Sequence, residues 1–335
     1  MLKKVGVILA AMCLAAVVAL TAAYLDLQKY AVTPALSQGR DQLIEIGAGQ
    51  AFKKTTEMLN TAGVITHPKK FEFLARLNGY DKKLKAGEYV LSASMSPNEI
   101  FDTLIKGAVK LHRLTVPEGY SINQIADLVA AAGFGSREAF IAAATTSSAV
   151  RENGIDADTF EGYLFPDTYY FPRDVSIQKI ISTMSNRFRE ILRPEWQAKA
   201  AEMGLTIHQI VTLASIIEKE TGASFERPLI SSVLHNRLRK GMRLEVDPTV
   251  IYGIKDFDGN LTREHLEHPT PYNTYKINGL PPGPIANPGA ESIEAALFPA
   301  ETTYLFFVSK KDNTHHFSSD LDEHRRAVRR YQLRK

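Results

Sequence analysis

Two glutamates, Glu218 and Glu220, stand near the end of an apolar segment, residues 205–222, which reads LTIHQIVTLASIIEKETG. A carboxyl group acts as a general acid when its surroundings favour the protonated form. On a helical wheel Glu218 falls inside the apolar stripe, about 80° from Ile210, and Glu220 falls about 80° to the other side, just beyond the edge. The two groups therefore cannot share one cleft floor, and Glu218 is predicted to face the core.

The predicted position of Glu218 suits an acid. An unpaired carboxyl group near a helix C-terminus is pushed towards its protonated form by desolvation and by the negative end of the helix dipole. The alternative is a structural glutamate that pairs with a buried arginine or caps a turn. Glu220 is expected to pair with a basic residue. Thr206 with Gln209 predicts the start of this helix, and Gly222 is a typical stop.

Longer strings surround these glutamates in a characteristic order. They are EGYLFPDTYYF at 161–171, ASIIEKETG, ERPLISSVLHNRLRKGMRLEVDPTVIYG and PYNTYKINGLPPGPIANPGAESIEAALFPA. In these strings and their order the sequence resembles the endolytic murein transglycosylase family, also called YceG-like. The likeness covers roughly residues 110–330.

The resemblance implies an activity and a catalytic residue. Members of that family cut peptidoglycan strands between N-acetylmuramic acid and N-acetylglucosamine without adding water, and leave a 1,6-anhydro end. Ordinary glycosidases use two carboxyl groups. Here the C6 hydroxyl of the sugar is the nucleophile, so one carboxyl group can first donate and then accept a proton. Glu218 sits where the family's catalytic glutamate sits, and no cofactor is expected.

Five further residues are candidates for binding the sugars. Asp247 precedes Pro248, which predicts an extended or turn backbone, and its carboxylate could orient a hydroxyl. The others offer rings, an amide or a hydroxyl near the same strings: Tyr252, Asn273, Tyr275 and Thr221. For each of these residues, simple packing or a satisfied turn is the alternative.

Composition excludes several other classes of protein. The chain mixes 40 basic with 37 acidic residues, so it lacks the basic surface of a nucleic-acid binder. Its one cysteine excludes an internal disulfide framework and multi-cysteine metal sites. Two pairs of histidines, His265 with His268 and His315 with His316, have weak metal-ligand spacing, and no metal site is predicted.

The first residues predict a membrane anchor. Residues 5–25 are uncharged and rich in Ala, Val and Leu, and Lys3 and Lys4 precede them. This length can span a bilayer, and the positive flank keeps residues 1–4 in the cytoplasm. With the resemblance, this places the protein in the bacterial inner membrane as a single-pass protein with a periplasmic body. A cleaved signal peptide is the alternative.

The rest of the chain predicts an α+β protein. Residues 26–42 are expected to form a polar tether. A strand–glycine–helix–glycine pattern follows twice, at 44–65 and 114–135, and a second echo pairs 87–91 with 161–165. The module that contains the first copy, residues 43–110, resembles a LysM-like module, which binds cell-wall glycan in other proteins. A structural α/β unit without a ligand is the alternative. Residues 111–335 are then the lytic transglycosylase domain.

Within that domain the sequence predicts helices at about 176–192, 194–203 and 225–240, an irregular proline-rich loop at 279–289 and a strand at 304–309. Asp320 and Glu323 mark the start of a C-terminal helix. The expected partners are peptidoglycan strands, the cytoplasmic membrane and peptidoglycan synthases. Two other functions stay open: a non-catalytic glycan-binding scaffold for cell-wall enzymes, and a hydrolase.

Overall fold

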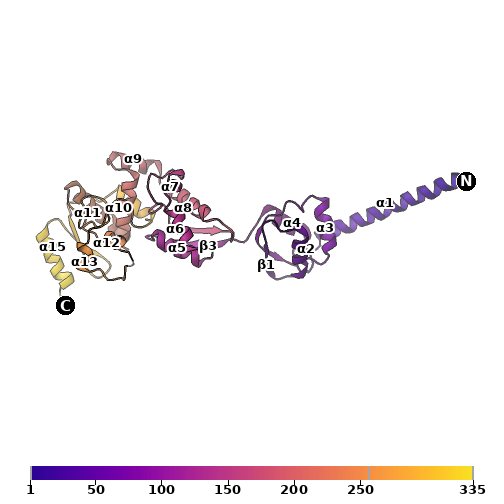
Figure 1. Cartoon of the computed structure of the whole chain (residues 1–335), viewed down its shortest axis with the longest axis horizontal. Helices are drawn as coiled ribbons and strands as arrows, with labels where there is room; N and C mark the ends of the chain where they lie inside the picture. The colour runs from indigo at the N-terminus through magenta and orange to yellow at the C-terminus, as the bar shows by residue number, and fades with distance from the viewer. Residues whose placement is uncertain (1, 256, 334–335) are drawn as a thin grey trace. The chain divides into compact units, whose positions relative to one another are not determined.

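A computed structural model describes residues 2–255 and 257–333. Met1 of the predicted cytoplasmic tail, and the last two residues of the predicted catalytic domain, lie outside these ranges. The chain divides into two compact units (Figure 1). The first unit holds Met1–His112 and Tyr170–Asp174, and the second holds Arg113–Tyr169 and Val175–Lys335. Both units mix helices with short strands, so the predicted α+β class is confirmed.

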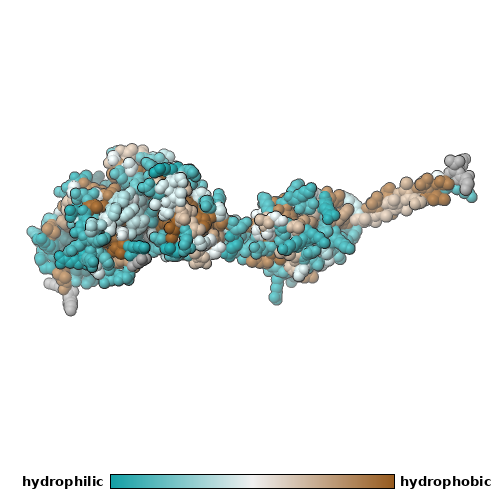
Figure 2. Space-filling model, in the orientation of Figure 1, coloured by the Kyte–Doolittle hydropathy of each residue, from teal (hydrophilic) through white to brown (hydrophobic). Residues whose placement is uncertain are grey.

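The N-terminal helix α1, Leu2–Val32, is long and apolar enough to cross a membrane. Its hydrophobic surface is visible in Figure 2. The helix continues beyond residue 25, so residues 26–32, expected in a tether, are helical. The reason is that Leu27, Tyr30 and Ala31 recur on one face and are buried in the core of the first unit.

The first unit packs three helices with one two-stranded sheet. The helices are α2 Phe52–Thr61, α3 Pro68–Leu77 and α4 Pro97–Lys106, and the strands are β1 Asp41–Ile46 and β2 Gly87–Ser92. The strands are antiparallel, with Asp41 opposite Ser92 and Ile46 opposite Gly87. Phe71 and Phe101 stack in the core at 4.1 Å between ring centroids. The likeness of this module to LysM stays a prediction.

The rest of the chain adds two more two-stranded sheets, β3 with β4 and β5 with β6, and many helices. The strands are β3 His112–Thr115, β4 Thr168–Phe171, β5 Phe306–Ser309 and β6 His315–Ser318. The helices before residue 210 are α5 Ile122–Ala131, α6 Arg137–Ala144, α7 Ser147–Glu152, α8 Ile177–Ile191 and α9 Pro194–Glu202. The later ones are α10 Ile207–Glu220, α11 Arg227–Arg239, α12 Asp247–Tyr252, α13 Arg263–Glu267, α14 Ala290–Leu297 and α15 Leu321–Val328.

The predicted repeat is present in the backbone. In the first copy, Gly49 lies between β1 and α2, and Gly63 follows α2. In the second copy, Gly119 lies between β3 and α5, and Gly133 follows α5. All four glycines have φ between 70° and 75°, which favours glycine. The second echo is wrong, because residues 161–165 form a turn and the strand is β4. Gly162 has φ 87°, which no strand adopts.

Helix α10 is the central helix of the second unit. The side chain of Thr206 accepts from the Gln209 N–H and the Gln209 side chain accepts from the Thr206 N–H, which confirms the predicted start. The helix ends at Glu220 and is capped by extended Thr221, not by Gly222. Every residue from Ile210 to Ile217 is buried. The wheel assumed one buried stripe, whereas α10 is covered on all sides by its neighbours α9, α11, α12 and α14.

Candidate active site

Glu218 lies on the last turn of α10 and already has two partners. Its side chain is only 7% exposed. The backbone N–H of Gly289 donates to its Oε2 at 3.0 Å, and Nη2 of Arg227 lies 3.7 Å from its Oε1. The pairing with a buried arginine, which the sequence left open, is therefore the arrangement observed.

Arg227 is the centre of a cluster of three glutamates. It is the first residue of α11 and is buried. Its Nη1 donates to Glu291 on α14, and its Nη2 lies 3.8 Å from Glu118. Burial, and then the negative charge of Glu218, raise the pKa of Glu118. Glu118, Arg227 and Glu291 were not predicted as site residues, because they come from three segments that are far apart in the chain.

Two loops hold this cluster together. The Gly119 N–H donates to the Asn287 carbonyl at 2.9 Å, and the Asn287 N–H donates to the Tyr120 carbonyl at 2.9 Å. These bonds fix Glu118 against the predicted irregular loop 279–289, which has no helix or strand. A Cβ on Gly289 would lie 2.0 Å from Oε1 of Glu118, so a side chain at position 289 would displace the Glu118 carboxyl group.

Glu220 has a different environment. It lines a cavity of about 360 Å³, together with Asp247, Tyr275, Phe306 and His324. Among the residues that the structure describes, no lysine, arginine or histidine lies within ion-pair distance of its carboxyl group, contrary to the expected basic partner. Burial, and secondly the charge of Asp247, raise the pKa of Glu220 to about 8. The carboxyl group is therefore mostly protonated at neutral pH and borders an open space.

Asp247 and Tyr275 lie together in this cavity. The Tyr275 hydroxyl donates to Oδ1 of Asp247 at 2.7 Å, and burial is the main cause that raises the pKa of Tyr275. The predicted extended or turn backbone of Asp247 is wrong, because Asp247 is the first residue of helix α12. Pro248 fits there because the N–H of a first-turn residue has no partner within the helix.

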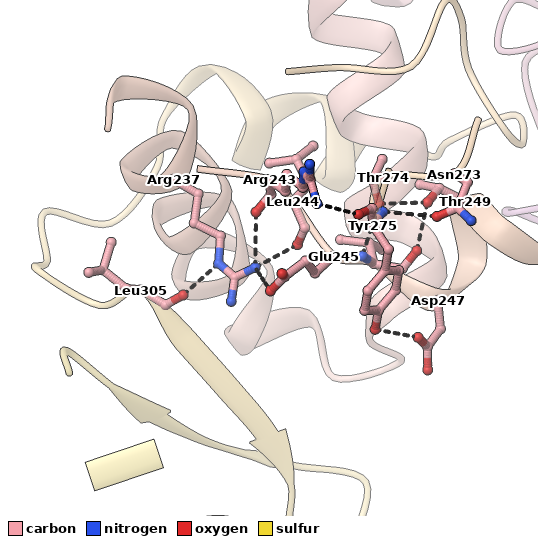
Figure 3. A network of polar contacts seen from close by, with 11 residues as sticks. Arg237, Arg243, Leu244, Glu245, Asp247, Thr249, Asn273, Thr274, Tyr275 and Leu305 are labelled. Carbon is pink, nitrogen blue, oxygen red and sulfur yellow. Dashed lines mark hydrogen bonds and ion pairs between the residues drawn. The ribbon is translucent and has the colours of Figure 1, made fainter. Parts of the chain in front are cut away.

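Arg237 on α11 fixes the segment that leads to Asp247 (Figure 3). Its Nε donates to the Leu305 carbonyl at 2.7 Å, and its Nη1 donates to the Leu244 carbonyl at 2.9 Å. The same Nη1 lies 3.2 Å from Oε2 of Glu245. Glu245 has φ 50°, a strained conformation for this residue type, which the surrounding contacts must maintain.

Three predicted binding residues lie away from this cavity lining. Asn273 is fully buried, and its Nδ2 donates to the carbonyls of His265, Leu266 and His268. Thr221 is also buried, and its Oγ1 accepts from the Ala223 N–H at 3.0 Å. Both side chains hold local loops, which was the alternative that the sequence left open.

The third, Tyr252, donates its hydroxyl to a buried glutamate, Glu161, at 3.1 Å. Glu161 also accepts from the Ile122 N–H at 3.1 Å and from Nδ2 of Asn287 at 3.0 Å. Burial, which outweighs these hydrogen bonds, raises the pKa of Glu161 to about 7. This glutamate ties α5, α12 and loop 279–289 together.

The histidine pairs have structural contacts. Nδ1 of His315 lies 2.7 Å from Oε2 of the buried Glu226, and the His265 side chain accepts from the Thr262 N–H. Within residues 2–255 and 257–333, no group of three or more His, Cys, Asp or Glu side chains is placed to hold a metal ion.

A carboxyl group whose pKa is raised to about 8, on the wall of a cavity, has the environment that general acid–base catalysis needs. Comparisons with known proteins identify the family. A model described as the YceG-like family matches residues 44–330. The chain therefore belongs to the YceG-like family, which confirms the resemblance found in the sequence.

Relatives of known name support the same family. The endolytic murein transglycosylase of Bacillus subtilis is 34% identical over 307 residues, which cover 86% of this chain and 84% of that protein. The endolytic murein transglycosylase of Streptococcus pneumoniae serotype 2 is 30% identical, and the match covers 85% of this chain and 57% of that protein. A yceG-like protein of Listeria monocytogenes has a solved structure that is 34% identical, with a TM-score of 0.60. That match covers 87% of this chain and 100% of that chain.

Proposed function

We propose that this protein is a membrane-anchored endolytic peptidoglycan lytic transglycosylase whose general acid is Glu220. The family and the names of its relatives support the substrate class. The observation that carries the choice of residue is the environment of Glu220, a carboxyl group with a pKa of about 8 on the wall of a cavity. A general acid works best when its pKa lies near the working pH.

The sequence predicted Glu218 for this role, and the contacts favour Glu220. Oε1 of Glu218 lies 3.7 Å from Nη2 of Arg227, and its Oε2 accepts a hydrogen bond from the Gly289 N–H, so both of its oxygens already have protein partners. Among residues 2–255 and 257–333, no cation lies within ion-pair distance of Glu220, which lines a cavity with the predicted binding residues Asp247 and Tyr275. In this proposal Glu218 positions the two loops, and Glu220 does the chemistry.

The reaction needs one carboxyl group. Glu220 donates its proton to the oxygen that links the two sugars, and the bond from that oxygen to C1 of N-acetylmuramic acid breaks. The C6 hydroxyl oxygen of the same sugar bonds to C1 and gives its proton to Glu220. The acid is thereby restored, no water is consumed, and the new end is a 1,6-anhydro sugar. Exclusion of water from the cavity favours this outcome over hydrolysis.

Asp247 is proposed to have two functions. Its charge helps to keep Glu220 protonated, and its free carboxylate oxygen can accept a hydrogen bond from a sugar hydroxyl. Tyr275 holds Asp247 in place through the 2.7 Å hydrogen bond. The rings of Phe306 and Phe307 line the same cavity and offer apolar faces to a pyranose ring.

The anchor completes the proposal. Helix α1 spans the inner membrane, Lys3 and Lys4 keep residues 1–4 in the cytoplasm, and the body is periplasmic. An enzyme held there would meet glycan strands as synthases release them, and would terminate or trim them. Synthases are therefore proposed partners, and the LysM-like module is a proposed glycan-binding part.

Digestion of purified peptidoglycan by the full chain, followed by mass analysis of the fragments, tests this function. The proposal predicts fragments that are lighter than hydrolysis products by one water, because their muramic acid ends are 1,6-anhydro. Reducing ends of full mass would show a hydrolase. Binding to peptidoglycan without any release would favour the scaffold.

A further inference from the structure

The junction between α1 and the first unit leaves a groove. The groove has a volume of about 490 Å³. It is lined by Leu20, Ala23 and Tyr24 of α1 and by Lys69, Phe73 and Leu77 of α3. Leu20, Ala23 and Tyr24 belong to the apolar segment 5–25 that we propose to span the membrane. The groove therefore continues the lipid-facing surface of the span.

Helix α1 cannot hinge freely at the edge of the span. It is one continuous helix to Val32, and Leu27, Tyr30 and Ala31 are buried in the core of the first unit. Asp26 pairs with Lys70 of α3, with 2.6 Å between Oδ2 and Nζ. Since residue 25 ends the apolar run, the first unit begins within one helical turn of the proposed bilayer surface.

Helix α3 has two apolar faces. Phe71, Leu74 and Ala75 are buried in the core, whereas Phe73 and Leu77 are 60% and 54% exposed. Lys70 contacts Asp26, just outside the span, and Leu77, two turns further along α3, lines the groove together with Leu20. The exposed stripe of α3 thus lies at the depth of the last turns of the span, as an interfacial amphipathic helix does.

The charge at the mouth of the groove is positive. Lys69 is exposed, and no carboxylate of the described residues lies within ion-pair distance of it. Lys70 is already neutralised by Asp26. Lysines at the membrane surface attract anionic headgroups, and Tyr24 is a side chain that favours this region.

We propose that the groove between α1 and α3 binds an anionic phospholipid of the surrounding bilayer. An acyl chain packs against Leu20, Phe73 and Leu77, and the headgroup phosphate pairs with Lys69. The contact fixes the first unit on the membrane surface. This inference rests on the proposed membrane anchor and not on the proposed chemistry.

Tryptophan quenching in nanodiscs tests the inference on the full chain. Trp196 is the single tryptophan, so a Trp196→Phe background allows Phe73→Trp to report from α3. Every bilayer contains equal amounts of phosphatidylglycerol and phosphatidylcholine, with brominated chains on one lipid or the other. We expect brominated phosphatidylglycerol to quench the Phe73→Trp variant at least about twofold more strongly than brominated phosphatidylcholine.

Three further substitutions show whether the lipid preference depends on the groove: a test at Lys69, a control at Lys54 and a reporter of insertion at Val17. Adding Lys69→Glu should abolish the preference, whereas Lys54→Glu, the same charge change at an exposed position of α2, should leave it unchanged. Equal quenching by the two lipids, or none, would overturn the inference. Val17→Trp in the same background reports insertion of α1 into the bilayer. Quenching at position 17 without quenching at position 73 would refute the lipid site alone. No quenching at either position would refute the anchor as well.

Discussion

Glu218 and Glu220 lie two residues apart on α10, and their carboxyl groups have opposite surroundings. Glu218 is held by Arg227 and the Gly289 N–H, whereas Glu220 borders a cavity and has a pKa raised to about 8. Side chains two positions apart on a helix point in different directions, so the end of α10 contacts two different parts of the second unit. The Glu218 side lies against Arg227 and loop 279–289, and the Glu220 side lies against the cavity where we propose that the substrate binds.

The charge of Asp247 should control the pH dependence of activity. A general acid must be protonated, so activity is present below its pKa and is lost as the pH rises through about 8. Asp247→Asn removes a charge that raises the pKa of Glu220, so the alkaline limb of kcat/KM should move to lower pH. The shift should be partial, because burial, the larger cause, remains. Asp102→Asn, at an exposed position of α4, is the control, and an unmoved limb in Asp247→Asn would refute the coupling.

The buried Glu161 should make the free energy of unfolding depend on pH. Its pKa is about 7 in the folded protein against a normal 4.5, so the folded state keeps a proton that the unfolded state loses. Titration of Glu161 leaves the free energy of unfolding unchanged below pH 4.5, lowers it as the pH rises from 4.5 to about 7, and lowers it no further above that. This decline should amount to about 3 kcal/mol and should be absent in Glu161→Gln. Urea unfolding at several pH values measures it, with Glu301→Gln as an exposed control.

Gly162 should not tolerate a side chain. Its φ is 87°, and an added Cβ would lie 2.5 Å from Cγ of Pro284 and 2.8 Å from Cγ1 of Val211. Gly162→Ala should lower the free energy of unfolding by about 2–4 kcal/mol, from backbone strain and overpacking together. Gly204 has φ 69° with nothing within 4 Å of the added atom, so Gly204→Ala should cost only about 1 kcal/mol. Equal losses in a denaturation series would contradict the packing argument.

The cluster around Arg227 should depend on its guanidinium. Arg227→Met leaves Glu118, Glu218 and Glu291 without their shared cation, and should lower the free energy of unfolding by about 3–5 kcal/mol. Arg263, whose side chain is 91% exposed, pairs with Glu267 on α13, and Arg263→Met should change stability by less than about 1 kcal/mol. Chemical denaturation compares the two. A loss in Arg227→Met no larger than the control would contradict a structural role for the cluster.

Local signals in the sequence predicted much of the fold. Capping residues predicted the start of α10 and of α15, where Asp320 accepts from the Glu323 N–H at 2.8 Å. Glycines that recur 70 residues apart, Gly49 with Gly119 and Gly63 with Gly133, predicted the two copies of the strand–helix repeat. These features depend on neighbouring residues, which a sequence shows directly.

The partners of the site glutamates could not be predicted in this way. The wheel places a side chain around its own helix, but it does not show that α10 is enclosed on all sides or that Arg227 begins the next helix beside Glu218. The pairing of Asp247 with Tyr275 joins residues 28 positions apart across a loop. Such contacts follow from tertiary packing, so the sequence identified Asp247 and Tyr275 as candidates without indicating that they face Glu220.

The most direct test of the account compares Glu220→Gln with Glu218→Gln in the release of anhydro-ended fragments from purified peptidoglycan. Glutamine keeps the size of each side chain but cannot donate the proton. We predict that Glu220→Gln slows release by at least about 100-fold with an unchanged unfolding transition, while Glu218→Gln retains activity within about tenfold. Full loss in Glu218→Gln, together with near-normal release by Glu220→Gln, would contradict the account and return the catalytic role to Glu218.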